Sequence, residues 1–170
     1  NAGGGSFGFS GFGLPMYAGS VSLGDLDADG DLDLVVTGTN AGGLPRLDRY
    51  MNDGSGAFSA STSFGTAIYR SASTLVDIDN DGDFDLVVSG KDIGGAARFD
   101  TYINPGTGAF GAPVVIAAGA GGAPSVGDID VDGDMELVAM GIPYGSSALR
   151  FYTNNGGAFT TFTATGMTLA

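Results

Sequence analysis

The sequence contains no cysteine, no histidine and no tryptophan. The absence of cysteine excludes disulfides, thiolate metal sites and cysteine nucleophiles. The absence of histidine removes both the commonest general base and the commonest ligand of transition metals. A metal site in this chain would therefore be built from oxygen atoms, and such sites suit hard cations.

Basic residues are also scarce, with six Lys and Arg against 19 Asp and Glu, which gives a net charge of -13. The six are scattered along the chain and form no basic patch, so we do not expect nucleic acid as a partner. No apolar run is long enough to span a membrane, and no segment has a convincing helical period. A length of 170 residues suits one ordinary domain or a few small repeats.

The acidic residues that are present lie mostly in three similar loops. Fifteen of the 19 fall within residues 25–33, 77–85 and 128–136, and the loops recur at spacings of 52 and 51 residues. Each loop has an acidic residue at positions 1, 3, 5, 7 and 9 and a glycine at position 6. An acidic loop that recurs at a nearly constant spacing indicates both a metal site and an internal repeat.

The loop pattern predicts calcium binding. Ca²⁺ takes about six to eight oxygen ligands at about 2.3–2.6 Å, and carboxylates at positions 1, 3, 5 and 9 can wrap around such an ion. Position 7 is expected to give its backbone carbonyl, and the glycine at position 6 permits the sharp turn. The predicted ligands of the three sites are Asp25, Asp27, Asp29, Asp31 and Asp33; Asp77, Asp79, Asp81, Asp83 and Asp85; and Asp128, Asp130, Asp132, Asp134 and Glu136. At position 2, Leu26, Ile78 and Ile129 are expected to point away from the metal into the core.

Other interpretations of the loops fit less well. An EF-hand shares the spacing but needs Glu at position 12 and flanking helices, whereas position 12 here is Val36, Val88 or Ala139 in an expected strand. A solvated acidic hairpin without a cation would leave five carboxylates in nine residues repelling one another. Mg²⁺ demands a tighter octahedral geometry. The third loop fits calcium least well, because Glu136 is one methylene longer than Asp.

Further elements recur together with the loops. A short apolar stretch precedes each loop, and a segment that ends in glycine follows it at residues 34–38, 86–90 and 137–141. A third segment, an Asn-containing turn and a fourth segment come next, and these patterns predict four short strands in each unit. We place the units at residues 20–70, 71–122 and 123–170, with residues 1–19 as the last strand of a preceding or swapped unit.

Repeated units of four antiparallel strands predict an all-β fold made of β-propeller blades, with the calcium loop between the first and second strands of each blade. A closed propeller needs about four to eight blades, and this sequence holds three units. We therefore expect either that the chain is part of a longer one or that copies associate into a homo-oligomer or polymer, for example two chains that make six blades.

These loops and repeats resemble the FG-GAP/VCBS repeat family, which occurs in integrin α-chain propellers, some fungal lectins and many secreted bacterial proteins. Residues 110–113, Phe-Gly-Ala-Pro, match the tetrapeptide for which the family is named, whereas Phe58-Ser-Ala and Phe159-Thr-Thr depart from it. The resemblance covers nearly the whole chain as a repeat pattern and implies a calcium-stabilised β-propeller. It implies no particular ligand, because the family serves adhesion, carbohydrate binding and scaffolding alike.

We expect the metal to be structural, because crowded carboxylates destabilise the metal-free state and ion binding adds stability by mass action. Extracellular modules bind Ca²⁺ at about 10⁻⁴–10⁻³ M, well above the cytosolic supply. An extracellular, secreted or cell-surface location is therefore expected.

Two functions fit this interpretation. The favoured one is a binding or adhesion module for a cell-surface protein or a carbohydrate. The alternative is a structural, self-assembling extracellular protein, such as a filament or a surface layer. Tyr50, Tyr102 and Tyr152 recur at one position and could form a repeated contact site, although packing in the core or between blades is the favoured reading.

We do not expect an enzyme. Nearly all the carboxylates are committed to the metal loops, and only four acidic residues lie elsewhere. Of these, Asp48 and Asp100 recur at equivalent positions beside Arg46 and Arg98. A repeated Arg–Asp pair favours inter-strand structure, since a catalytic site is normally unique.

Overall fold

The computed structural model describes residues 16–118, 122–140, 149–157 and 159–162. These residues form twelve strands and no helix, and so no helix that is long and apolar enough to cross a membrane. The strands, in chain order, are β1 (Met16–Tyr17), β2 (Val21–Gly24), β3 (Asp33–Asn40), β4 (Pro45–Tyr50), β5 (Thr62–Val76), β6 (Asp85–Lys91), β7 (Ala97–Tyr102), β8 (Val114–Ala118), β9 (Ser125–Gly127), β10 (Glu136–Met140), β11 (Leu149–Thr153) and β12 (Thr160–Phe162).

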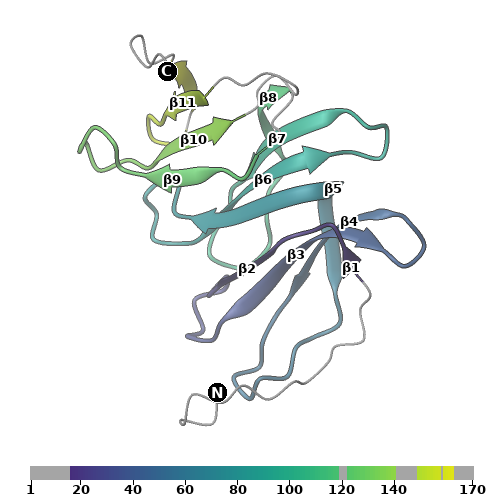
Figure 1. Cartoon of the computed structure of the whole chain (residues 1–170). Helices are drawn as coiled ribbons and strands as arrows, with labels where there is room; N and C mark the ends of the chain where they lie inside the picture. Colours follow the sequence, from purple (N-terminus) through teal and green to yellow (C-terminus); the bar gives the residue numbers. More distant parts are fainter. Residues whose placement is uncertain (1–15, 119–121, 141–148, 158, 163–170) are drawn as a thin grey trace, which may run out of the picture.

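The described strands pair only in the antiparallel sense, which confirms the predicted all-β class. One sheet has the order β1-β3-β4-β5-β6-β7-β8, with β2 also paired to β3, and a second sheet has the order β12-β11-β10-β9. Figure 1 shows the strand groups stacked in chain order, from β2–β4 to β9–β11. The described residues do not close into a ring, so propeller blades stay a prediction.

The long strand β5 differs from the prediction of two separate strands at the first junction between units. Its beginning pairs with β4 and its end pairs with β6. The pairing with β6 shifts register between Tyr69 and Ala72, where Arg70 has a φ of 48°. The chain crosses this junction without a break because residues 66–76 contain neither glycine nor proline. At the second junction, the Gly- and Pro-containing residues 119–124 separate β8 from β9.

Strand β1 repeats the arrangement found in the middle of β5, where β5 begins to pair with β6. Tyr17 of β1 pairs with Thr39 of β3. Tyr69, which lies 52 positions after Tyr17, pairs in the same way with Lys91 of β6. Each tyrosine is followed by a residue with positive φ, 50° at Ala18 and 48° at Arg70. The described part of the predicted segment 1–19 therefore runs along β3 like the end of a fourth strand. Residues 1–15 lie outside the described residues.

Two clusters of buried apolar side chains form the core, and each joins neighbouring units. One cluster contains Leu26, Val35, Leu47 and Ile68 from the first unit and Leu86, Val88 and Tyr102 from the second. The other contains Val76, Ile78, Val87 and Phe99 from the second unit and Leu137, Ala139 and Tyr152 from the third. Full burial of one large apolar side chain stabilises a fold by about 1.5–3 kcal/mol. These junctions therefore hold the units together.

Alternation along the strands explains how one sheet serves two junctions. Successive side chains of a strand point to opposite faces of the sheet. In the second unit, Leu86, Val88 and Tyr102 face the first unit, and we name this side the leading face. Val87 and Phe99 face the third unit from the opposite side, which we name the trailing face.

The recurring tyrosines pack in the interior, as the favoured interpretation predicted. Tyr50, Tyr102 and Tyr152 expose 6%, 0% and 1% of their surface. The Tyr102 ring meets the Phe64 ring edge-on, with centroids 5.7 Å apart. Its hydroxyl accepts a hydrogen bond from the Thr66 N–H at 2.9 Å, and burial raises its pKa. Of the three rings, those of Tyr102 and Tyr152 belong to the clusters that join neighbouring units.

Candidate metal centres

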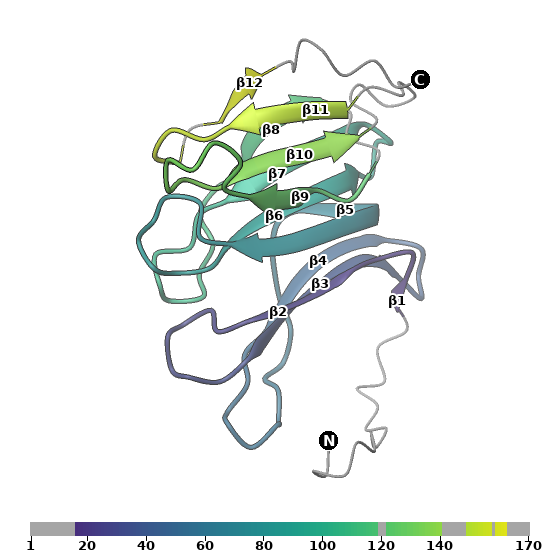
Figure 2. The same cartoon turned by 60° about the vertical axis from the view of Figure 1, so that its left-hand side comes forward.

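The three acidic loops share one backbone path. They connect β2 to β3, β5 to β6 and β9 to β10, and Figure 2 shows all three on the same side of the molecule. Position 4 takes a left-handed conformation in each loop, and so does the glycine at position 6. The φ values are 58°, 60° and 64° for Ala28, Asn80 and Val131, and 93°, 96° and 100° for Gly30, Gly82 and Gly133.

The carboxylate at position 1 draws the loop around itself. Asp25 accepts hydrogen bonds from the backbone N–H groups of Asp29 at 3.2 Å and Gly30 at 2.9 Å. Asp29 in turn accepts one from the N–H of Asp31 at 2.9 Å. The second loop repeats these bonds through Asp77 and Asp81. These hydrogen bonds curl the first two loops around their position-1 carboxylates.

The carboxylate at position 9 is fully buried, and both of its oxygens accept hydrogen bonds. Asp33 accepts from the N–H of Leu26 at 2.9 Å and of Asn52 at 2.7 Å. The same two bonds recur at Asp85, with lengths of 2.8 and 2.7 Å. The sequence assigned this position to the metal alone. Its oxygens also fasten the loop to the turn that follows the third strand, and each keeps a lone pair for a cation.

Glu136 at position 9 of the third loop fits less closely. Its Oε2 accepts from the N–H of Ile129 at 2.8 Å, but its Oε1 lies 3.5 Å from the N of Asn154. The extra methylene therefore leaves the third loop less firmly tied to its turn than the other two.

The carboxylate at position 3 has an oxygen that no protein group satisfies. Asp27 Oδ1 and Asp79 Oδ1 are buried and have no hydrogen-bond partner. Burial, followed by the nearby carboxylates, raises the pKa of Asp27, Asp79 and Asp130. A buried oxygen without a partner is costly, and a cation at the loop centre would satisfy it. The residues present therefore fit a hard cation.

The structure brings three acidic residues together in each loop. Their carboxylate oxygens lie within 4.8 Å of one another in the groups Asp25, Asp27 and Asp29; Asp77, Asp79 and Asp85; and Asp128, Asp130 and Glu136. These oxygen clusters can hold a metal ion. Asp33, Asp81 and Asp132 are the predicted carboxylate ligands that stand outside these groups. At position 7, Asp134 Oδ2 accepts a hydrogen bond from the Gly156 N–H at 3.1 Å. This is consistent with metal ligation through the backbone carbonyl of Asp134 alone.

Residues 25–88 match the FG-GAP-like repeat family. The match confirms the resemblance for this segment, which contains the first two acidic loops and the strands between them. Among curated proteins, none matches the chain. The chain thus contains an FG-GAP-like repeat module, and the third loop lies beyond the matched segment.

Sequence reasoning missed the role of the asparagine in the turn that follows the third strand of a unit. Asn104 Nδ2 donates to the Leu26 carbonyl at 2.8 Å, and Asn154 Nδ2 donates to the Ile78 carbonyl at 2.6 Å. Each amide therefore crosses to position 2 of the acidic loop in the unit before it. The recurrence of Asn at this place was the available signal, but it also suits an ordinary turn.

The second and third loops also touch directly. Asn80, at position 4 of the second loop, donates from Nδ2 to Asp134 Oδ1 at 2.6 Å. The first and third loops carry Ala28 and Val131 at this position, which have no such donor.

The prediction for Ile129 was wrong. Leu26 and Ile78 at position 2 are 1% exposed and lie in the core, whereas Ile129 is 51% exposed. The first two loops are covered by the unit that follows them. No described residue covers the third loop in this way, so its position-2 side chain stays at the surface.

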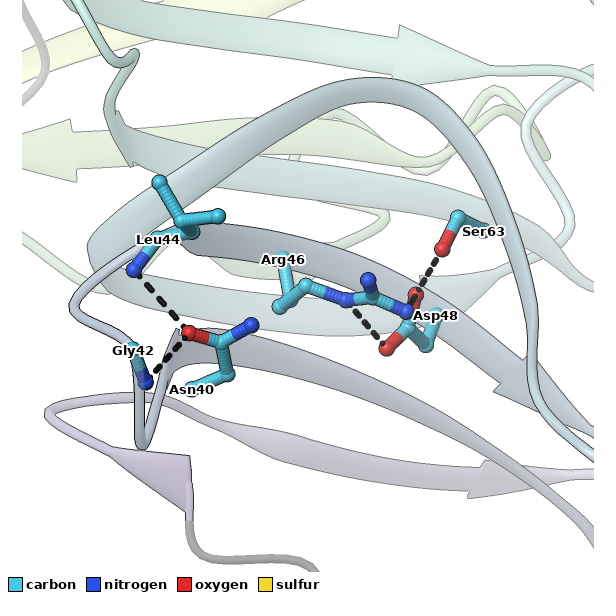
Figure 3. Close-up of polar contacts among 6 residues, drawn as sticks. All are labelled: Asn40, Gly42, Leu44, Arg46, Asp48 and Ser63. Atoms are coloured by element: carbon cyan, nitrogen blue, oxygen red, sulfur yellow. Dashed lines mark hydrogen bonds and ion pairs between the residues drawn. The ribbon is translucent and has the colours of Figure 1, made fainter.

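The Arg–Asp pairs lie within single strands rather than between strands. Arg46 Nε and Nη2 contact the two carboxylate oxygens of Asp48 in β4 at 2.9 Å each, and Ser63 of β5 donates to Asp48 Oδ1 at 2.6 Å (Figure 3). Arg98 and Asp100 form the equivalent contact at 2.7 Å. Residues two apart share one face of a strand, which explains the difference from the prediction. The neighbouring turn closes on Asn40 Oδ1, which accepts from Gly42 and Leu44.

Proposed function

We propose that the chain is a calcium-stabilised, non-catalytic, extracellular repeat module that serves binding or adhesion. The observation that carries the calcium part is the buried, unsatisfied oxygen at position 3 of two loops, on Asp27 and Asp79. This oxygen has no hydrogen-bond donor among the described residues, and a cation would give it a ligand bond.

Calcium suits the loops better than the other common cations. The donors are carboxylate and carbonyl oxygens, which favour Mg²⁺, Ca²⁺ or Mn²⁺ over softer metals. Ca²⁺ accepts about six to eight oxygens in an irregular shell, whereas Mg²⁺ keeps several of its waters. A loop with five oxygen donors in nine residues fits the larger ion.

The ion would act on stability. The position-1 and position-9 carboxylates already fix the loop to its own strands and turn. A ligand that binds only the folded state adds about 2.7 kcal/mol at a concentration 100 times its dissociation constant. Millimolar calcium outside the cell is about 1 to 10 times the dissociation constant of a site of extracellular affinity and would add about 0.4–1.4 kcal/mol for each site, which supports the extracellular location.

The binding or adhesion role rests on the FG-GAP-like repeat and on the rigid scaffold that the junctions build. A cell-surface protein or a carbohydrate is the ligand class that this repeat favours. Self-assembly is the second candidate, and apolar surface at both ends of the stack supports it. Val21 and Leu23 of the first unit and Met140 of the third are 61%, 58% and 61% exposed.

The calcium proposal is tested by thermal unfolding of chelator-treated protein during titration with Ca²⁺ and, separately, Mg²⁺. We expect the melting temperature to rise with Ca²⁺ and far less with Mg²⁺. Asp79→Asn should lose much of this rise, because it weakens the second loop. Asp53→Asn is the matched control, since Asp53 is exposed, lies in a turn outside the loops and keeps an acceptor oxygen as Asn. An unchanged melting temperature in calcium would refute the proposal. Binding is tested separately on an array of glycans and cell-surface proteins in calcium.

A further inference from the structure

We propose that a pocket between β4 and β5 of the first unit binds a neutral sugar ring. The pocket has a volume of about 420 Å³ and is lined by residues 45–47 of β4 and by residues 63–65 and Ala67 of β5. This inference names a site for the carbohydrate ligand of the proposed function, and it rests on that function.

The pocket lies where β5 takes a longer path than the strand beside it. Asp48 pairs with Ser63 and Arg46 pairs with Ile68, so the five steps from 63 to 68 lie opposite the two steps from 46 to 48. Residues 64–67 have no partner in this ladder, and we name them the arch. The arch leaves room beside β4, and the pocket occupies this room.

The second unit has a shorter path at the same place. Asp100 pairs with Val115 and Arg98 pairs with Ala118, so the three steps from 115 to 118 lie opposite the two steps from 98 to 100. The first unit therefore carries two more residues here than the second. This difference marks the arch as a local elaboration of one unit rather than a feature of the repeat.

The arch is held in place by the second unit. The Thr66 N–H donates to the Tyr102 hydroxyl at 2.9 Å. The Phe64 ring stacks on the Phe110 ring with centroids 4.8 Å apart. Gly65 has a φ of 57°, and a Cβ atom there would collide with the Tyr102 ring. These contacts fix the arch without a ligand, so the pocket is formed in advance, as most small-molecule sites are.

Arg46 supplies the main polar group of the pocket. Its Nε and Nη2 each lie 2.9 Å from an oxygen of Asp48, to which Ser63 also donates at 2.6 Å (Figure 3). Asp48 does not contact Nη1, which carries two further N–H donors. The Arg46 side chain is 35% exposed, so a ligand can reach this nitrogen.

The arch adds donors and acceptors of its own. Phe64, Gly65 and Ala67 have backbone N–H and C=O groups without ladder partners. The Ser63 hydroxyl oxygen can still accept a hydrogen bond while it donates to Asp48. The pocket therefore presents donors and acceptors side by side.

This mixture of groups favours a neutral hydroxylated ligand. The charges of Arg46 and Asp48 cancel, and the chain as a whole has a net charge of -13, so the site offers an anion little attraction. A hydroxyl group both donates and accepts, and apolar residues such as Pro45 and Leu47 in the lining suit the C–H groups of a ring. The volume lies in the range of about 300–1,000 Å³ that small-molecule sites occupy. A neutral sugar ring combines these properties.

Access to the pocket does not depend on what precedes the first unit. Arg98 and Val115 of the second unit stand at the positions of Arg46 and Ser63, and the first unit packs against the second. The Arg98 side chain is nevertheless 24% exposed, and Val115 is 53% exposed. A preceding unit therefore leaves this part of a unit open.

Amide NMR spectra of the nitrogen-labelled chain in millimolar calcium test the proposal. Glucose, galactose, mannose, fucose and N-acetylglucosamine are titrated separately. We expect at least one of them to shift the amide signals of Gly65 and Ala67 in a saturable way. Glucuronate and galacturonate should bind more weakly than glucose and galactose, because they add a negative charge.

Two substitutions and a matched control assign the binding to this pocket. Arg46→Lys keeps a positive charge beside Asp48 but removes Nη1, and it should weaken sugar binding about ten-fold. Ala67→Phe fills the pocket and should abolish the shifts. Arg98→Lys changes the same kind of Arg–Asp pair in the second unit and should leave the affinity unchanged. Melting temperatures in calcium establish that the variants are folded.

The possible failures are distinguishable. Sugar binding that Arg46→Lys and Ala67→Phe leave unchanged would refute this site alone, and the carbohydrate form of the proposed function would stand. Tighter binding of the uronates would overturn the assignment of a neutral ligand. Spectra that no sugar changes would refute the site, while the calcium melting curves and the array of cell-surface proteins judge the proposed function separately.

Discussion

The second and third units carry the same acidic loop in two different surroundings. In the second unit, Ile78 is buried at 1% exposure, Asp85 is tied at both oxygens, and the third unit covers the loop. In the third unit, Ile129 is 51% exposed and the second bond of Glu136 is 3.5 Å long. A loop with one pattern of carboxylates is therefore buried at position 2 where a neighbouring unit covers it. The local sequence sets the path of the loop, the neighbouring unit sets its burial, and the longer side chain of Glu136 weakens its bond to the following turn.

The test with the largest expected effect on stability removes the carboxylate at position 9. Asp85→Ala leaves the N–H groups of Ile78 and Asn104 without an acceptor, and each orphaned buried group costs about 1–3 kcal/mol. We expect a loss of about 2–5 kcal/mol in the free energy of unfolding in calcium, measured by denaturant titration. Glu136→Ala should cost clearly less, because one of its two bonds is already long. Equal losses would contradict the contrast between the units.

A second test compares the asparagine inside a junction with the one at the end of the stack. Asn104 is fully buried and donates to Leu26 and Phe84, so Asn104→Ala should lower the free energy of unfolding by about 2–3 kcal/mol. Asn52→Ala should cost about 1 kcal/mol or less, because the amide loses only two exposed bonds of 3.2 Å, one to the Leu32 carbonyl and one from the Gly56 N–H. Both are measured by denaturant titration at a protein concentration too low for copies to associate. A costlier Asn52→Ala would contradict the role given to the junction.

A third test exploits position 4 of the loops. Val131 has a φ of 64°, a left-handed conformation that costs an L-residue about 1–2 kcal/mol and suits Asn better. Val131→Asn should therefore raise the free energy of unfolding by about 1 kcal/mol. The opposite exchange, Asn80→Val, should lower it, since it adds this strain and removes the bond to Asp134. Loss of stability in Val131→Asn would show that the side chain matters more than the backbone at this position.

A fourth test measures how the free energy of unfolding depends on pH in chelator. Burial raises the pKa of Asp85 from 3.8 to about 6, so the metal-free folded state binds more protons than the unfolded state between these values. The free energy of unfolding should therefore fall as the pH rises from about 4 to about 6. Asp85→Asn should flatten this slope, whereas Asp53→Asn should not. In saturating calcium the slope should weaken or reverse, because the ion binds the deprotonated loop.

The sequence predicted the elements that depend on short-range patterns. The loop at residues 25–33 follows from its own spacing of acidic residues and glycine, and the antiparallel strands follow from the segments around it. The sharp turn expected at position 6 is present, and Gly30 and Gly82 take a left-handed conformation there.

Features that depend on distant residues were not predictable. The bond from Asn104 to the Leu26 carbonyl joins residues 78 positions apart, and no local pattern encodes it. The continuous path of β5 depends on how it passes from pairing with β4 to pairing with β6 near Arg70. The exposure of Ile129 depends on what covers it, since its immediate sequence neighbours resemble those of Ile78.

Titration calorimetry of chelator-treated protein with Ca²⁺ tests the central claim most directly. The difference between the units predicts tighter Ca²⁺ binding at the first two loops than at the third. Each chain should bind three ions in total. Asp130→Asn should remove the weak phase alone, and Asp79→Asn should remove part of the tight phase. Absence of calcium binding, or three sites of equal affinity, would contradict the account.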